Sequence, residues 1–306
     1  MRIGFGAPVA GAWAGPDSLA RFAEQAETLG YQSLWTFQRL LVPEPAPGHA
    51  PAEPQYRSVL DPMIALAYAA ARTTRIRLGV AVLNMPYLAP TYLAKQAATL
   101  DLLCGGRLDL GLGNGWSGPE FTATGADPAQ RGARAEEYVT VLRAHWAPGP
   151  ASFHGRFYSV PPSRMDPKPV QDHPGPPILL GGAAPAALRR AGRLADGWLA
   201  RSATDLTTVG ASVAIVREAA EQAGRDPDTL RIIVRGVTRY DPGGHGTPGP
   251  DGRRLPLSGN AEQIRSDREQ LAGQGVTEVY HDLNWDPRIG SPDAERDRAL
   301  QRAEQI

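Results

Sequence analysis

Residues 77–116 read RLGVAVLNMPYLAPTYLAKQAATLDLLCGGRLDLGLGNGW and contain one complete strand–helix–strand unit. The apolar runs Arg77–Asn84 and Leu108–Gly113 have the length and composition of buried strands. Between them, residues 90–103 predict a helix that ends before Gly105 and Gly106. Two strands joined by a helix of this length are expected to lie parallel in one sheet.

The same alternation of apolar runs and amphipathic stretches continues in both directions along the chain. Further strands are expected at Ile3–Ala7, Ser33–Phe37, Pro177–Gly181, Gly197–Ala200, Leu230–Thr238 and Glu278–Leu283. Further helices are expected from a cap at Asp17 to Leu29 and over 60–73, 129–146, 185–195, 207–223, 260–273 and 292–305. Eight strands, each followed by a helix, predict one α/β domain over residues 1–306, a closed (β/α)8 TIM barrel rather than an open doubly wound sheet.

Two irregular stretches interrupt this pattern. Residues 147–176 carry many prolines and predict an insertion with a hairpin centred on residues 153–158. Residues 241–258, DPGGHGTPGPDGRRLPLS, predict a long loop after the seventh strand. Because loops at the carboxyl ends of barrel strands carry function, we expect both stretches near the active-site rim.

The composition excludes several classes of protein. Of the 306 residues, 42% are hydrophobic, and 32 Lys and Arg balance 32 Asp and Glu. A chain without net charge has no general attraction to nucleic acid or to an anionic membrane. The single cysteine, Cys104, suits a reducing compartment, and the apolar stretch near 62–71 is too short to span a bilayer. We therefore expect a cytoplasmic protein that acts on a small molecule, with no nucleic-acid or membrane partner.

The sequence carries no motif for metal binding or for a nucleophile. HExxH, paired CxxC, GxxxxGK and GxSxG are all absent, so nothing indicates a zinc hydrolase, a P-loop NTPase or an α/β-hydrolase. The six histidines are scattered without ligand spacing. We therefore expect no metal site.

Three strand ends carry residues that could hold a ligand. The turn GLGNGW (111–116) has GxGxG spacing, which is not the dinucleotide fingerprint GxGxxG that opens into a helix. Gly181, Gly182 and Ala183 precede a helix near Pro185, where free backbone N–H groups form either an anion site or a plain strand-to-helix turn. Asn84 ends a third strand and places an amide at the rim.

In this order, the three segments resemble the bacterial-luciferase-like superfamily, and most closely its deazaflavin (coenzyme F420)-dependent oxidoreductases. Other matching strings are GYQSLW (30–35), RGARAEEYVTVLRAHW (131–146), FHGRFYSV (153–160), DPKPVQ (166–171) and PPILLGGAAPAALRRAGRLADGWLA (176–200). The resemblance runs from residue 1 to about residue 200 and is loose beyond it. It implies a homodimer, which we expect to form through the apolar helices 60–73 and 90–103.

The resemblance also implies which residues hold the cofactor. The Ala81–Val82 peptide matches a strand bulge, often with a non-prolyl cis bond, that supports the isoalloxazine or deazaflavin ring, and Asn84 matches a position near the polar edge of that ring. The turn that lines the ring in the family corresponds to Gly113, Asn114, Gly115 and Trp116. The family's phosphate cradle corresponds to Gly181, Gly182 and Ala183. Arg134 matches a helix arginine that reaches the phosphate. The other interpretation of Arg134 is a solvent-facing charge.

The chain departs from the family pattern after the second strand. Many relatives carry an acidic residue followed by His there, whereas this chain has Thr36, Phe37, Gln38 and Arg39. Gln cannot ionise and Arg keeps its charge, so neither replaces histidine as a proton carrier. Gln38 and Arg39 are candidate catalytic residues that bind and polarise the substrate, although Arg39 could equally pair with a neighbouring carboxylate. Trp13, in the first strand-to-helix loop, is a third candidate for the pocket.

The seventh strand carries three arginines at even spacing. Arg231, Arg235 and Arg239 fall on one face of that strand. If the face pointed into the barrel, Arg239 would lie nearest the rim and could meet an anion. We expect the face to point outward and to pair with carboxylates on the helices.

The resemblance implies an oxidoreductase in which reduced F420 passes hydride from its C5 to a small organic acceptor, or the reverse. The alternative is an FMN-dependent luciferase-like monooxygenase, because reduced flavin reacts with oxygen through a nitrogen that deazaflavin lacks. A second alternative, motivated by the missing acidic–His pair, is a cofactor-binding barrel without catalysis. The acceptor-facing loops, 40–57 and 241–258, carry no motif that names the substrate.

Overall fold

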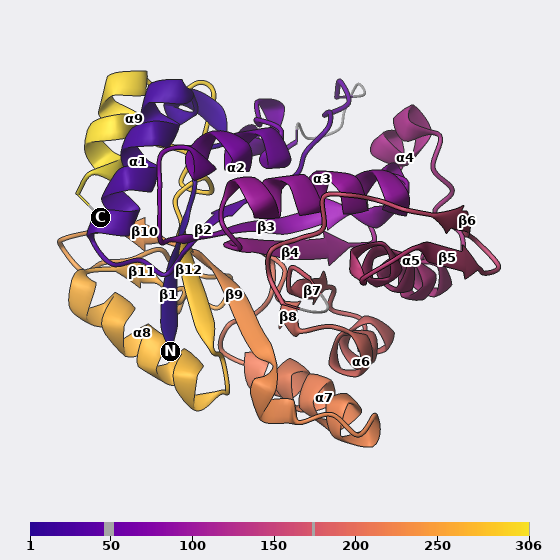
Figure 1. The fold of residues 1–306 in the computed structure, drawn as a ribbon. Coiled ribbons are helices and arrows are strands. Elements are labelled where there is room, and N and C mark those ends of the chain that lie inside the picture. Colours follow the sequence, from indigo (N-terminus) through magenta and orange to yellow (C-terminus); the bar gives the residue numbers. More distant parts are fainter. Residues whose placement is uncertain (46–51, 173–174, 306) are drawn as a thin grey trace.

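The computed structural model describes residues 1–45, 52–172 and 175–305. Eight parallel strands close into a barrel in the order β1-β12-β9-β8-β7-β4-β3-β2 (Figure 1). They are β1 (Arg2–Gly6), β2 (Ser33–Thr36), β3 (Arg77–Asn84), β4 (Leu108–Gly113), β7 (Ile178–Gly181), β8 (Gly197–Leu199), β9 (Arg231–Val237) and β12 (Glu278–Asp282). Every expected strand is present to within one residue at each end, which confirms the (β/α)8 barrel.

Helices surround the barrel. They are α1 (Pro16–Thr28), α2 (Pro62–Ala70), α3 (Pro90–Leu103), α5 (Arg131–Trp146), α6 (Pro185–Leu194), α7 (Val209–Gln222), α8 (Ala261–Gly273) and α9 (Arg296–Ala303). These confirm the eight expected helices, some with shorter ends. The cap of α1 was predicted wrongly, because the helix begins after Gly15 and Asp17 lies inside its first turn.

The structure adds short elements that the sequence pattern did not predict. These are α4 (Gly118–Thr124) and the 3-10 helices η1 (Gly11–Trp13), η2 (Pro54–Arg57), η3 (Met85–Tyr87) and η4 (Pro227–Thr229). Each is at most seven residues long, so none spans enough turns to show a helical period. Among them, α4 matters for function because it brings a carboxylate to the barrel rim.

Both irregular stretches contain paired strands. The insertion holds the antiparallel hairpin of β5 (Ala151–His154) and β6 (Ser159–Ser163), which lies beside α5 (Figure 1) and confirms the expected hairpin. The long loop is tied at both ends, because β10 (Arg239–Tyr240) pairs in parallel with β11 (Ser258–Gly259). Within the loop, Arg254 contacts Asp267 of α8 at 2.7 Å. Among the described ranges, no helix is long and apolar enough to cross a bilayer.

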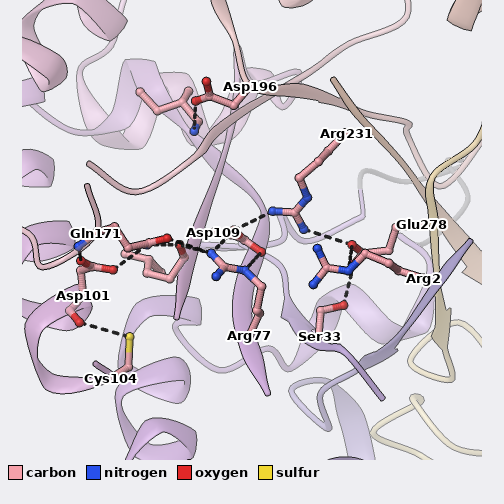
Figure 2. Close-up of polar contacts among 12 residues, drawn as sticks. Arg2, Ser33, Arg77, Asp101, Cys104, Asp109, Gln171, Asp196, Arg231 and Glu278 are labelled. Atoms are coloured by element: carbon pink, nitrogen blue, oxygen red, sulfur yellow. Dashed lines mark hydrogen bonds and ion pairs between the residues drawn. The ribbon is translucent and has the colours of Figure 1, made fainter. Parts of the chain in front are cut away.

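An ion cluster fills the amino end of the barrel. Asp109 of β4 lies 2.6 Å from Arg77 of β3 and 2.7 Å from Arg231 of β9, and Glu278 of β12 lies 3.0 Å from Arg231 (Figure 2). Arg2 and Ser33 complete the contacts of Glu278. Burial raises the pKa of the Asp109 carboxyl, but Arg231 and Arg77 lower it further, so the net pKa lies below its ordinary value. The cluster closes this end of the barrel with paired charges.

An apolar layer lies on this cluster and separates it from the rim. Its members are Trp35, Leu179, Leu199, Ile233 and Tyr280, with Ala81 and Val82 packed against them. Arg231 and Arg235 of β9 therefore point into the barrel, and the expectation that they face outward is wrong. Arg239 lies in β10 and does not line the cavity at the rim. Arg231 finds one carboxylate partner on the neighbouring strand β12 and the other on β4, which barrel closure brings within reach.

Candidate active site

One cavity opens where the strands end. Its volume is about 610 Å³, which is in the usual range for a small-molecule site. The predicted residues that line it are Gln38, Arg39, Ala81, Val82, Asn84, Gly113, Asn114, Gly115, Trp116, Gly181, Gly182 and Ala183. A second hollow of about 840 Å³ lies beside Gly106, Gln171 and Arg231, at the end of the barrel where such folds do not place chemistry.

The floor of the cavity is the bulge of β3. The pairing of β3 with β4 shifts register between Val80 and Leu83, and the Ala81–Val82 peptide is cis, so both features implied by the family resemblance are present. A Cβ built on Gly113 would lie 2.5 Å from Val82 Cγ2. Glycine at that position therefore lets the Val82 side chain lie across the strand ends as a flat apolar surface.

Gln38 and Asn84 join two strand ends beside this floor. The backbone N–H of Asn84 donates to Gln38 Oε1 at 2.9 Å. This contact fixes the orientation of the Gln38 amide and leaves its Nε2 group as the donor available to a ligand. Gln38 is buried and lines the cavity, as predicted.

The turn after β4 presents an unpaired acceptor. Asn114 Oδ1 is buried, and no donor among the described residues reaches it. The next residue, Gly115, has φ +69°, and its carbonyl accepts from Arg131 Nη1 at 3.1 Å. Since a buried acceptor without a donor is costly, Asn114 is suited to a ligand that brings an N–H or O–H group.

Arg39 is held by a carboxylate and two aromatic rings. Its Nη1 lies 3.2 Å from Glu120 Oε1 of α4, and both side chains are buried. The guanidinium lies 4.3 Å from the ring centre of Tyr56 and 4.6 Å from that of Trp116. Burial and the neighbouring Glu120 raise the pKa of Tyr87 to about 12. Of the two interpretations of Arg39, the structure supports pairing with a carboxylate, which shapes the rim.

The opposite end of the cavity contains the start of α6, where the sequence predicts an anion site. Helix α6 begins after Ala184, whose methyl side chain cannot cap it. Pro185 has no N–H and the Ala187 N–H donates to the Ala184 carbonyl at 2.8 Å, so the Ala186 N–H is the donor of the first turn that is left for a ligand. Gly182 precedes it with φ +144°, and a Cβ there would lie 2.6 Å from Ala187 Cβ. Three arginines line this end of the cavity, namely Arg131, Arg190 and Arg201.

Two predicted site residues lie elsewhere. Trp13 does not line the cavity: it is fully buried against Phe22, and its Nε1 donates to Asn284 Oδ1 at 3.0 Å. Arg134 lies one turn further along α5 than Arg131, and its guanidinium stacks 4.8 Å from the ring centre of Phe157 in the hairpin. Arg134 therefore supports the insertion and does not line the cavity, contrary to the prediction, whereas Arg131, Arg190 and Arg201 do line it.

The structure also brings in residues that were not predicted to lie at the site. Phe37, Tyr56 and Arg235 line the cavity, and Glu120 lies behind it. The even spacing of the arginines in β9 was the only signal for Arg235, and nothing marked Tyr56. Of the two acceptor-facing loops, residues 46–51 lie outside the described residues, and residues 241–258 do not line the cavity. The loop at 241–258 instead packs on α8.

Comparison with known proteins gives three findings. The profile of the family described as luciferase-like monooxygenase matches residues 3–242. An uncharacterised protein of Mycobacterium tuberculosis is 33% identical over 233 residues, which cover 72% of this chain and 79% of that protein. The F420-dependent glucose-6-phosphate dehydrogenase of Nakamurella multipartita is also 33% identical, over 247 residues that cover 78% of this chain and 68% of the relative.

A solved structure shares the architecture. The crystal structure of monooxygenase RslO1 from Streptomyces bottropensis matches with a TM-score of 0.80 and 23% identity, over 99% of this chain and 97% of the other. At that level of identity, the likeness concerns the fold alone.

Proposed function

This chain belongs to the luciferase-like monooxygenase family, and we propose that it is an F420-dependent oxidoreductase that transfers hydride between the deazaflavin C5 and a small organic molecule. The proposal depends on one observation. A single cavity joins the flat apolar floor at Val82 to the uncapped start of α6 and its arginines. A flat ring with an anionic tail matches both ends of that cavity.

The ring end fits the cofactor in chemistry as well as shape. Val82 offers an apolar face, and Gly113 and Gly181 leave the room that Val82 needs. Flavins and deazaflavins both carry an N–H in their pyrimidine ring, and Asn114 Oδ1 is a buried acceptor that lacks a donor. These residues would hold either ring.

The end of the cavity at α6, where the anionic tail of the cofactor would lie, favours F420 over FMN. The start of α6 can bind one phosphate, which is all that FMN requires. F420 carries carboxylates beyond its phosphate, and Arg131, Arg190 and Arg201 supply cations around the same end. The name of the Nakamurella relative agrees with this choice.

The protein's own part in the reaction is to bind and orient. Bound F420 would supply the hydride chemistry, while the floor, the Asn114 amide and the α6 cradle fix the position of the ring relative to the substrate. No histidine lines the described part of the cavity, and Gln38 and Asn114 do not ionise, but Glu53 and Tyr56 also line it and carry ionisable groups. We therefore propose that any proton needed comes from one of these two side chains or from water.

The cofactor is tested by calorimetric titration of the cofactor-free protein with F420 and, separately, with FMN. We expect F420 to bind more tightly. The substitution Arg201→Gln should weaken F420 binding about two- to fivefold, because an exposed ion contact contributes about 0.2–1 kcal/mol, and the loss should shrink at high salt. Arg134→Gln is the matched control and should change the affinity less than about twofold.

Two outcomes would reject parts of the proposal. Tight binding of FMN with no binding of F420 would reject the cofactor and favour the monooxygenase. Tight binding of F420 with no oxidation of the reduced form by any acceptor in a broad panel would leave a carrier rather than an oxidoreductase. Stopped-flow absorbance of the bound cofactor measures that oxidation.

A further inference from the structure

The end of the cavity away from α6 contains a buried arginine with free donors. Arg235 of β9 lines the cavity and is 8% exposed. Its Nε donates to the Tyr280 hydroxyl at 2.6 Å and its Nη2 donates to the Ala81 carbonyl at 2.7 Å. No described residue accepts from its Nη1. The two N–H groups of Nη1 are therefore left for a ligand directly beside the floor on which the ring would lie.

The charge of Arg235 is already balanced. Asp282 Oδ2 lies 3.3 Å from Arg235 Nε, and the side chains are 8% and 2% exposed. Asn284 holds the other carboxylate oxygen by donating to Asp282 Oδ1 from its backbone N–H at 3.0 Å and from Nδ2 at 2.7 Å. Trp13 in turn donates to Asn284 Oδ1. Trp13, which the sequence predicted in the pocket, therefore lies behind the site and holds Asn284, which in turn orients Asp282 beside Arg235.

The second cation at this end is balanced in the same way. Arg39 pairs with the buried Glu120, so neither arginine at this end brings an unmatched positive charge. A second anion placed at Arg235 would lie close to Asp282 in a poorly hydrated site, where repulsion between like charges is strong. An uncharged oxygen would accept the Nη1 hydrogen bonds without that cost.

Aromatic side chains form the walls around these donors. Phe37 and Tyr56 line the cavity, and the Phe37 ring centre lies 4.7 Å from that of Trp285, which covers the guanidinium of Arg235 at 4.2 Å. Trp116 continues the wall toward solvent, 6.3 Å from Tyr56. Walls of this kind favour a flat or apolar molecule.

We propose that this part of the cavity, Phe37, Gln38, Tyr56 and Arg235, binds a neutral planar carbonyl compound whose oxygen accepts from Arg235 Nη1, and that it discriminates against anionic substrates such as sugar phosphates. The inference deepens the proposed function, on which it rests, by naming the substrate class. The contrast with the α6 end supports it, because the cations there are not matched by buried carboxylates.

The test compares a neutral and an anionic ligand built on one aromatic skeleton, and adds a sugar phosphate as a third ligand. Protein saturated with F420, and cofactor-free protein in parallel, is titrated calorimetrically with 4-hydroxyacetophenone, 4-hydroxybenzoate and glucose 6-phosphate. We expect the ketone to bind at least tenfold more tightly than either anion. Arg235→Lys should weaken ketone binding about tenfold, because hydrogen bonds from a charged donor are lost from a fixed geometry. Arg231→Lys, an equivalent change in the same strand at the closed end of the barrel, should leave it within about twofold.

A second variant tests whether Asp282 neutralises the charge of Arg235. Asp282→Asn keeps the shape of the side chain and removes the charge that neutralises Arg235, so the affinity for 4-hydroxybenzoate should rise at least fivefold while the ketone changes little. A merely structural role of Asp282 would not narrow the preference for the ketone in this way. Tighter binding of an anion than of the ketone to the wild type, or unchanged ketone binding in a folded Arg235→Lys protein, would overturn the inference. Failure of F420 to bind would reject the proposed cofactor alone, because the titrations of cofactor-free protein are read separately.

Discussion

Gly182 shows at the level of one residue how backbone geometry makes the proposed anion site. Its φ of +144° is one that side chains rarely adopt, and an added Cβ would lie 2.6 Å from Ala187 Cβ at the start of α6. We expect Gly182→Ala to lower the free energy of unfolding by about 1–2 kcal/mol and to weaken F420 binding about tenfold, because the first turn of α6 must shift. Denaturant unfolding and calorimetry measure the two effects.

The control for this prediction is Gly118→Ala. A Cβ at Gly118, the first residue of α4, meets nothing within 4 Å, so this variant should unfold within about 0.5 kcal/mol of the wild type. A Gly182→Ala protein that binds F420 as tightly as the wild type would show that the cofactor does not use the α6 cradle.

Single residues were also where the sequence-based predictions were least secure. Gly113, Gly181 and Gly182 line the cavity, and a glycine at a strand end could be singled out because it reports on its own backbone. Their contact with a cofactor stays a prediction. The prediction for Arg134 failed because a long side chain can reach several partners, and its choice of Phe157 over the cradle depends on where the hairpin packs. Trp13 failed for the same reason, since Asn284 lies far from it in sequence.

At the level of elements, a carboxylate of α1 holds the turn that leads into β3. Glu27 accepts from the backbone N–H groups of Thr74, Arg75 and Ile76, at 3.0, 2.6 and 2.8 Å. Burial raises its pKa, but these hydrogen bonds lower it more, to about 2 from an ordinary value of 4.5. Since the folded pKa is the lower one, this stabilisation is complete above about pH 4.5 and is lost as the pH falls toward 2.

We expect Glu27→Gln to lower the free energy of unfolding by about 1–2 kcal/mol at pH 7, because charge-assisted bonds to the turn are replaced by weaker ones. The difference from the wild type should shrink between pH 4.5 and 2, as followed by denaturant unfolding across that range. Glu24 lies on the same helix as Glu27 and forms an exposed ion pair with Arg72, which follows α2. Glu24→Gln removes that pair and should lower the free energy of unfolding by less than about 0.5 kcal/mol. Equal losses in the two variants would contradict the role of Glu27.

The short helix α4 explains why the interpretation of Arg39 stayed open at the sequence level. Its seven residues follow a glycine-rich turn and are too few to show periodicity. Glu120 in this helix is the residue that pairs with Arg39 and accepts from the backbone N–H of Leu40 at 2.8 Å. Without α4, the sequence gives no reason to place a carboxylate at the second strand end.

At the level of the whole molecule, α2 and α3 lie next to each other (Figure 1), and each carries exposed apolar side chains. Ile64, Tyr92 and Leu103 on these helices are 73%, 60% and 70% exposed. Exposed apolar side chains gathered in this way are typical of a protein interface. The homodimer through these helices therefore remains a prediction, now with specific residues.

We expect the protein to be a dimer by light scattering at micromolar concentration, and Ile64→Lys to make it a monomer by placing a charge in the apolar interface. Leu29→Lys is the control, because Leu29 is 76% exposed after α1, outside the α2–α3 surface, and should not change the mass. A wild-type monomer, or an Ile64→Lys dimer, would show that this surface is not the interface.

The sequence alone determined the barrel, the eight strands and the glycine-rich turns at the ends of β4 and β7, because periodicity and glycine placement are local properties of the chain. Only the tertiary structure decided which side chains meet: Arg231 with Asp109 and Glu278 and Arg235 with Asp282 inside the barrel, and Arg39 with Glu120 at its rim. The physical reason is that these partners lie far apart in the sequence. Pairing places β12 beside β9, barrel closure brings β4 within reach of β9, and the packing of α4 brings Glu120 to Arg39, and no local pattern in the chain encodes these contacts.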